Sequence, residues 1–210
     1  LRIAGLARCP CRYGKSAGEP TFDSVRASAI GARDYFLART GAPFTDLTLL
    51  GRSLGGGVTS YIVSATAGDP RALILQSTFA SLRETAANGF PLVRWLIERV
   101  YSIDFDSEHW NDSDAAVPSP VDSGCASCFC FGPGEKFLSG YPNCLFQYHG
   151  DDDDTVPYDQ GKQLFDVVSR TSDPSCTEFF TQPGFGHDNA MGPAEQAATA
   201  AFANANARDP

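Results

Sequence analysis

A serine flanked by glycines is the residue most suited to covalent chemistry in this sequence. Residues 51–55 (GRSLG) satisfy the pattern G-x-S-x-G, and they lie between a predicted strand and a predicted helix. In such a strained turn the serine hydroxyl is exposed above the sheet, and side chains at Gly51 and Gly55 are expected to collide with the turn. The N-terminus of the following helix favours developing negative charge. Ser53 is therefore a candidate nucleophile, and the backbone N–H of Leu54 is a candidate oxyanion donor.

Two later loops carry groups that could activate this serine. Residues 149–157 (HGDDDDTVP) follow a third predicted strand, and residues 184–189 (GFGHDN) follow a fourth. Catalytic groups in parallel sheets gather at the carboxyl ends of the strands, so we expect both loops to converge on Ser53. His187 would then act as the general base, and an aspartate of the acidic loop would orient it. Taken alone, the acidic loop is typical of a solvated loop or a calcium site, and a loop histidine is typical of the surface.

The other two histidines fit the role of base less well. His149 ends its predicted strand directly before the acidic loop, where we expect it to pack or to hold the loop. His109 lies in a stretch rich in Asp and Ser, just before Trp110, and we expect it at the surface. Neither follows a strand in the order that the serine, acid and base would require.

The elements that would position these groups alternate along the chain. The apolar patterns predict helices at 22–39, from about 58 to 68, 91–101, 158–170 and 193–206, and strands at 47–50, 72–75, 144–148 and 176–180. This alternation predicts a doubly wound α/β fold with a mostly parallel sheet, in a single domain over residues 1–210. Residues 117–142 are rich in Pro, Gly and Cys and interrupt the pattern, so we expect a long loop or an insertion there.

Charge and composition exclude several classes of partner. The hydrophobic fraction of 42% and the charged fraction of 20% are those of an ordinary globular protein. The net charge of −9 argues against nucleic acid and anionic membrane surfaces as partners and favours a neutral or cationic substrate. The expected partner is a small-molecule or acyl substrate. No apolar run is long enough to cross a bilayer, so no membrane span is expected. The sequence begins with Leu1 rather than Met, which leaves membrane association through upstream residues open.

The cysteines favour a reducing environment and do not indicate a metal. An odd number of cysteines in a chain of this size fits reduced thiols better than a disulfide framework, which favours an intracellular location. Cys125, Cys128 and Cys130 lack the regular spacing of a structural zinc site, so we expect neither a metal nor a cofactor. The seven cysteines are Cys9, Cys11, Cys125, Cys128, Cys130, Cys144 and Cys176.

Four blocks of sequence resemble one known family. Residues 12–20 (RYGKSAGEP) resemble, one glycine short, the RGYGKSEGEP stretch of the α/β-hydrolase-domain proteins, which include membrane-associated serine hydrolases and protein depalmitoylases. Residues 51–56, 72–82 and 149–157 resemble the family's nucleophile elbow, the strand after it and the acid loop, in the family order. The resemblance covers about residues 11–110 and 142–195. It implies an α/β-hydrolase fold and a triad in the order serine, acid, histidine, with Asp153 as the acid.

The chain also departs from the family pattern. Family members carry an HGN-like loop upstream of the block that matches residues 12–20, and that loop supplies a second oxyanion donor. The sequence starts after it, so the resemblance implies a partial domain that lacks the first strands of its sheet. Residues 117–142 have no counterpart in the family.

These observations lead to one hypothesis and two alternatives. The hypothesis is a serine esterase or thioesterase that uses Ser53, His187 and Asp153, with residues 89–110 as a wall of the acyl pocket. A peptidase of the serine aminopeptidase type would share the fold and the triad. A non-catalytic, hydrolase-like binding protein would explain the missing oxyanion loop. Fold resemblance does not separate the three, because chemistry belongs to the site.

Overall fold

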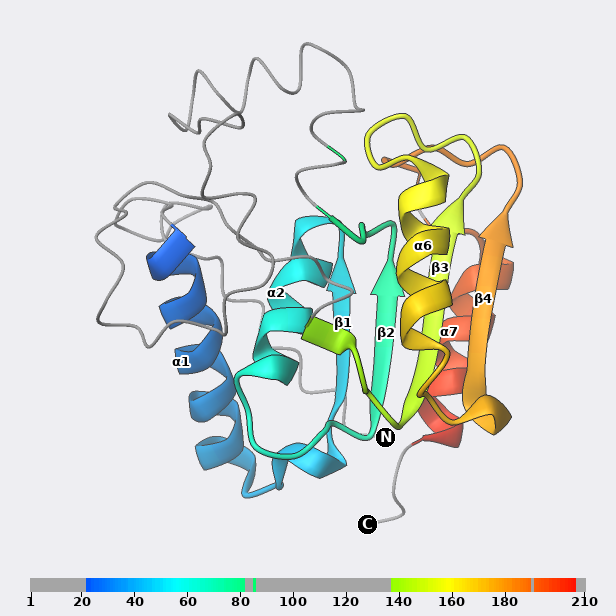
Figure 1. The fold of residues 1–210 in the computed structure, drawn as a ribbon. Coiled ribbons are helices and arrows are strands. Elements are labelled where there is room, and N and C mark those ends of the chain that lie inside the picture. The colour runs from blue at the N-terminus through cyan, green and yellow to red at the C-terminus, as the bar shows by residue number, and fades with distance from the viewer. Residues whose placement is uncertain (1–21, 82–84, 86–136, 190, 207–210) are drawn as a thin grey trace.

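A four-stranded parallel sheet occupies the centre of the computed structural model, which describes residues 22–81, 85, 137–189 and 191–206. The strands lie side by side in their chain order, with their carboxyl ends at the top of Figure 1. This arrangement confirms the predicted doubly wound α/β fold with a parallel sheet. The strands are β1 (Thr48–Arg52), β2 (Ala72–Gln76), β3 (Cys144–Gly150) and β4 (Thr177–Gln182).

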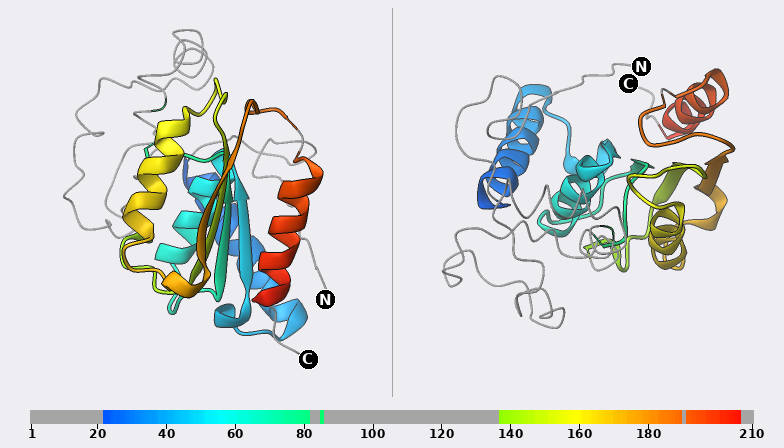
Figure 2. Two further views of the ribbon diagram at one scale, coloured as in Figure 1. Left: turned by 90° about the vertical axis from the view of Figure 1, so that its right-hand side faces the viewer. Right: turned by 90° about the horizontal axis from the view of Figure 1, so that it is seen from above.

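Helices cover both faces of this sheet. Helices α2 and α6 lie on one face and α7 on the other, while α1 contacts α2 (Figures 1 and 2). The helix after Ser53 begins four residues earlier than the sequence predicts, because the glycines at its start are helical. The α-helices are α1 (Phe22–Thr40), α2 (Leu54–Ser64), α6 (Tyr158–Val168) and α7 (Pro193–Ala205), and short 3₁₀ helices are η1 (Phe44–Asp46) and η3 (Pro174–Cys176).

Side chains of the inner strands alternate between two cores. Leu73 and Leu75 of β2 pack with α2 and α6, whereas Ile74 belongs to the core under α7. Burial on both faces explains why these strands are recognisable as continuous apolar runs. The first core contains Val63, Leu73, Leu75, Ala80, Leu138, Tyr141, Leu145, Leu164 and Val168. The second contains Ile74, Phe146 and Tyr148, packed against Phe180, Ala198, Phe202 and Ala203.

The end of the predicted insertion contributes to the first core. Leu138 and Tyr141 are buried, and the Tyr141 hydroxyl donates to the carbonyl of Pro70 at 3.1 Å. An apolar pair three residues apart therefore anchors this segment beside the sheet. Residues 117–136 of the predicted insertion lie outside the described residues, as do His109, the predicted helix 91–101 and the predicted pocket wall 89–110.

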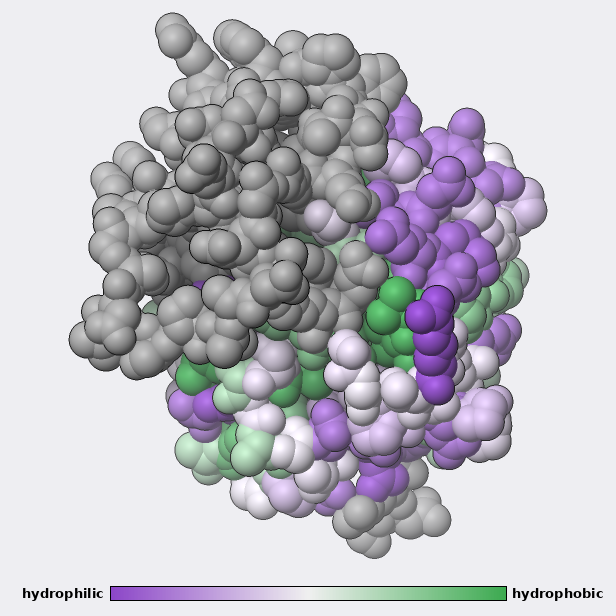
Figure 3. Space-filling view, in the orientation of Figure 1, coloured by the Kyte–Doolittle hydropathy of each residue, from purple (hydrophilic) through white to green (hydrophobic). Residues whose placement is uncertain are grey.

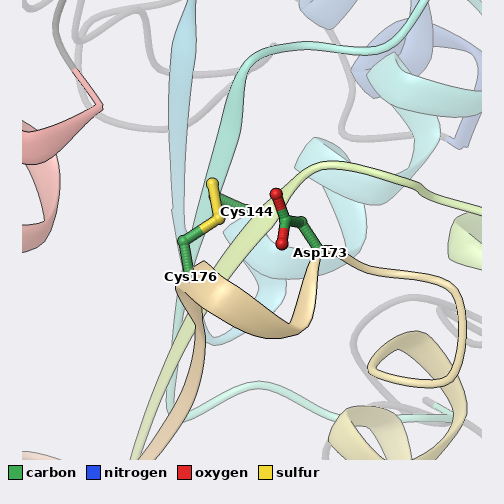
Figure 4. Close-up of side chains that lie close together, drawn as sticks. All are labelled: Cys144, Asp173 and Cys176. Atoms are coloured by element: carbon green, nitrogen blue, oxygen red, sulfur yellow. A yellow bond between two sulfur atoms is a disulfide. The ribbon is translucent and has the colours of Figure 1, made fainter.

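A disulfide joins Cys144 and Cys176, which corrects the expectation that these thiols are reduced (Figure 4). Cys144 begins β3 and Cys176 directly precedes β4, and the parallel pairing of these strands brings the two Cα atoms to 5.0 Å. The two cysteines are 32 residues apart in the sequence, so their spacing does not indicate the contact. The contact results from the pairing of β3 with β4. Asp173 lies beside the disulfide, but the bonded sulfurs offer no thiolate to a metal ion.

The surface around the carboxyl ends of β3 and β4 is hydrophilic. Figure 3 shows hydrophilic residues gathered at the upper right, over the loops that follow these two strands. The acidic residues 151–154 belong to the first of these loops. Within the described ranges, no helix combines the length and the apolar character needed to cross a bilayer.

The disulfide gives a first testable expectation. Replacing both Cys144 and Cys176 by serine should lower the free energy of unfolding by about 3–4 kcal/mol, because the cross-link removes loop-closure entropy from the unfolded chain. Urea denaturation under non-reducing conditions measures the difference. The reduced native sequence should unfold at the same urea concentration as the double variant. Equal midpoints for the oxidised protein and the variant would contradict the expectation.

Candidate active site

Ser53 lies in a strained turn between β1 and α2. Its φ of 51° falls in the left-handed region, which is costly for a residue with a side chain and persists only where the surroundings enforce it. Two bonds to the segment around the end of β2 enforce it here. The Ser53 N–H donates to the carbonyl of Gln76 at 2.9 Å, and the Thr78 hydroxyl donates to the carbonyl of Ser53 at 2.8 Å. The neighbouring strand therefore holds the backbone of the nucleophile candidate.

The motif predicts the steric role of one of its two glycines correctly and that of the other wrongly. A Cβ at Gly51 would lie 2.6 Å from the carbonyl oxygen of Gly55 and from the Thr59 hydroxyl, so Gly51 is required as expected. At Gly55, however, a Cβ would meet nothing within 4 Å in the described part of the chain, so the expected collision there is wrong. Gly56 is the tight position instead, because its Cβ would overlap with the Thr78 side chain.

Asp153 is the aspartate of the acidic loop that turns inward. Its side chain is fully buried, and Oδ1 accepts the backbone N–H groups of Thr155 at 3.0 Å and Val156 at 2.8 Å. Burial raises the pKa of Asp153, but hydrogen bonds from His149, His187 and the Val156 N–H lower the pKa by more, so this carboxyl titrates well below its usual range. Ionised Asp153 therefore stabilises the fold fully above the unfolded pKa of about 3.9. This stabilisation is lost progressively as the pH falls from that value through the lower pKa of the folded state.

His187 bridges Ser53 and Asp153. Its Nδ1 lies 2.9 Å from Asp153 Oδ2, and its Nε2 lies 3.0 Å from Ser53 Oγ. An ionised carboxylate only accepts, so Nδ1 carries the proton of the neutral ring and Nε2 is left to accept the serine hydroxyl. The side chain is largely buried. The structure thus brings together the three side chains that the sequence singles out, in the geometry of a serine with a base and an orienting acid.

The acidic loop and the histidine loop are bonded to each other. The Gly184 N–H donates to Asp151 Oδ1 at 2.7 Å, and the Asp152 N–H donates to the carbonyl of Phe185 at 3.1 Å. Gly150 allows this close approach, because a Cβ there would overlap with the Phe185 carbonyl. The relative position of Asp153 and His187 is therefore set by backbone contacts as well as by their own bond.

Arg52 belongs to the site although the G-x-S-x-G motif does not indicate it. Its guanidinium donates from Nη2 to the backbone carbonyl of His187 at 2.5 Å and lies 3.7 Å from Asp188 Oδ1. Arg52 thus connects the nucleophile turn to the histidine loop. It occupies a variable position of the G-x-S-x-G pattern, and the pattern alone does not indicate where its side chain lies.

Comparison with known proteins reveals similar sequences and folds. The α/β-hydrolase domain-containing protein WAV2 of Arabidopsis thaliana is 33% identical over 85 residues, which are 40% of this chain and 28% of that protein. Lysophosphatidylserine lipase ABHD12 of Gallus gallus is 28% identical over 185 residues, which are 83% of this chain and 43% of that protein. The uncomplexed acylaminoacyl peptidase of Pyrococcus horikoshii has a TM-score of 0.59 at 12% identity, over 83% of this chain and 26% of that one. No protein-family model matches.

These similarities define the class of the protein. The chain has the α/β-hydrolase fold, as its motifs predict. In sequence it resembles the α/β-hydrolase-domain proteins, which confirms the family resemblance of its motifs. It spans less than half the length of the curated relatives it matches.

The glycines of the turn provide a matched pair of variants. Gly56→Ala should destabilise the protein by about 1–3 kcal/mol, since the added methyl group displaces Thr78 from its bond to the Ser53 carbonyl. Gly55→Ala should be neutral or stabilising by up to about 1 kcal/mol, because alanine favours the helix and finds open space. Urea unfolding of the two variants measures both changes. Equal destabilisation by the two substitutions would show that the contact with Thr78 is not the cause.

Proposed function

We propose that this chain is the catalytic part of a serine hydrolase that cleaves an ester or a thioester by acyl transfer. The observation that carries this proposal is the unbroken series of hydrogen bonds from Ser53 through His187 to Asp153. A base that can accept the serine proton, oriented by a buried carboxylate, is the arrangement that makes a hydroxyl nucleophilic at neutral pH. The three groups would then be the catalytic triad.

In the first half of the reaction the acyl group moves to the enzyme. Ser53 Oγ attacks the carbonyl carbon while His187 Nε2 takes the hydroxyl proton, and the carbonyl π electrons move to the oxygen. The tetrahedral intermediate then collapses, the bond to the leaving oxygen or sulfur breaks, and His187 returns its proton to that atom. Asp153 keeps Nδ1 protonated throughout and stabilises the imidazolium.

In the second half water replaces the leaving group. His187 removes a proton from water as the water oxygen attacks the acyl-serine carbonyl. Collapse of the second intermediate breaks the bond between the acyl carbon and Ser53 Oγ, and the proton on His187 passes to that oxygen. The products are a carboxylic acid and the free serine, and no oxidant or metal takes part in the balance.

The backbone N–H of Leu54 is the oxyanion donor in this proposal. Leu54 is the first residue of α2, and the first N–H groups of a helix have no partner within the helix. An N–H at this position, with the positive end of the helix behind it, stabilises the negative oxygen of the intermediate.

Acyl esters of lipids are the first natural substrates to test. One relative is named a lysophosphatidylserine lipase. Its alignment covers 83% of this chain, with 28% of the aligned residues identical. Thioesters with the same acyl chain are the second class of substrate to test, because the same attack on the carbonyl carbon cleaves an ester or a thioester bond. A peptidase would use the same three residues, and comparing amide with ester substrates of one acyl group separates the two activities.

Labelling by a fluorophosphonate probe tests the proposed nucleophile. The probe should react with Ser53, because a serine activated by His187 attacks phosphorus as it attacks a carbonyl carbon. Mass spectrometry of the digested adduct identifies the modified residue. Ser53→Ala should abolish labelling, whereas Ser64→Ala should leave labelling unchanged, because Ser64 is an exposed serine at the far end of α2, the helix that follows Ser53.

Two outcomes contradict the proposal. Undiminished labelling of the Ser53→Ala variant would assign the reactive hydroxyl elsewhere. A folded protein that neither reacts with the probe nor hydrolyses p-nitrophenyl esters would favour a hydrolase-like binding protein.

A further inference from the structure

A second histidine lies against the acidic loop. His149 belongs to β3 and its side chain is fully buried. Its Nε2 lies 2.9 Å from the carbonyl oxygen of Val156 and 3.3 Å from Asp153 Oδ2. Both of these oxygens only accept, so Nε2 carries the proton and donates to the loop. Its Nδ1 has no hydrogen-bond partner in the described part of the chain, so the ring's polar contacts are all with the loop.

A glycine in the facing helix makes room for this ring. Gly161 lies inside α6 and its φ is not positive, so the backbone does not require glycine there. In such a position glycine costs the helix about 0.5–1 kcal/mol relative to alanine. A Cβ at Gly161 would overlap with Nδ1 of His149. Gln147, two residues earlier on β3, donates to the carbonyl of Gly161 at 2.7 Å and fixes the helix at this distance. The imidazole of His149 therefore lies between α6 and the acidic loop, in contact with both.

The contact with His149 fixes the Val156 end of the acidic loop. The Val156 N–H donates to Asp153 Oδ1, while the Val156 carbonyl accepts from His149. Both backbone polar groups of Val156 are therefore hydrogen-bonded, the N–H to Asp153 and the carbonyl to the His149 ring. Asp153 Oδ2 lies 2.9 Å from His187 Nδ1 and 3.3 Å from His149 Nε2. A side chain on a rigid central strand therefore fixes the direction of the carboxylate that orients His187.

We propose that His149 is a positioning residue for Asp153, held in place by the space that Gly161 leaves. The proposal rests on the proposed function, because it assigns His149 an effect on turnover through Asp153. His149 contacts neither Ser53 nor a reacting atom in this proposal. Its loss lets Asp153 and the Val156 peptide rotate, which misaligns His187 in the transition state more than it weakens substrate binding.

Hydrolysis of a p-nitrophenyl ester by substituted versions of the 210-residue chain tests this role. His149→Leu removes the donor and should lower kcat by about 10–100-fold with KM little changed, as expected for a small misplacement of a catalytic group. His149→Gln keeps an N–H near the position of Nε2 and should recover most of that loss. Gly161→Ala leaves every polar group in place but displaces the ring, and should lower kcat in the same way. Lys162→Ala, at the partly exposed neighbouring position, is the control and should turn over normally.

Titration of active sites with the fluorophosphonate probe separates positioning from stability. Rates are expressed per labelled Ser53, so a variant that merely folds less well shows a normal kcat per site. A normal kcat per site in both His149→Leu and Gly161→Ala would overturn the positioning role while the proposed function stands. If His149→Leu does not fold, Gly161→Ala alone decides. Failure of the unsubstituted protein to react with the probe would overturn both proposals.

Discussion

The candidate site depends on the hydrogen bonds that surround the buried carboxylate of Asp153. A charge removed from water is costly unless hydrogen bonds replace its hydration, and here donors approach from two loops and a central strand. The backbone N–H groups of Thr155 and Val156 come from its own loop, His187 comes from the loop after β4, and His149 comes from β3. The same bonds that make the charge tolerable also determine where His187 can lie.

The rest of the fold holds the two sides of this site in register. Ser53 keeps its strained backbone because Gln76 and Thr78 bond to it, and Arg52 connects the same turn to the histidine loop. The disulfide between Cys144 and Cys176 joins β3 and β4 at their amino ends, opposite the loops that carry Asp153 and His187. Strands tied at one end and loops bonded at the other leave these loops little freedom to separate.

Local patterns predicted the elements, the serine, the histidine and the acidic loop, while contacts between distant segments escaped prediction. Parallel strands buried on both faces are continuous apolar runs, and the order of the loops after them indicated Ser53, His187 and the acidic loop. The family resemblance then selected Asp153 among the aspartates of that loop. The partners of Arg52 and His149 depend on how loops fold over the sheet. The tight glycine is Gly56 rather than Gly55 because Thr78, far along the chain, packs there. The disulfide likewise follows from strand pairing, which spacing does not reveal.

The central claim is that one buried carboxylate of the acidic loop orients the base. The most direct measurement is kcat for Asp153→Asn beside Asp154→Asn, per active site titrated in each. Asp154 is exposed and its carboxylate accepts only from the Thr155 hydroxyl among the bonds described, so its variant should keep a normal kcat. Asp153→Asn should lower kcat by about 10⁴-fold, because an amide favours the wrong tautomer of His187. A normal kcat for Asp153→Asn, or a large loss for Asp154→Asn alone, would contradict the account.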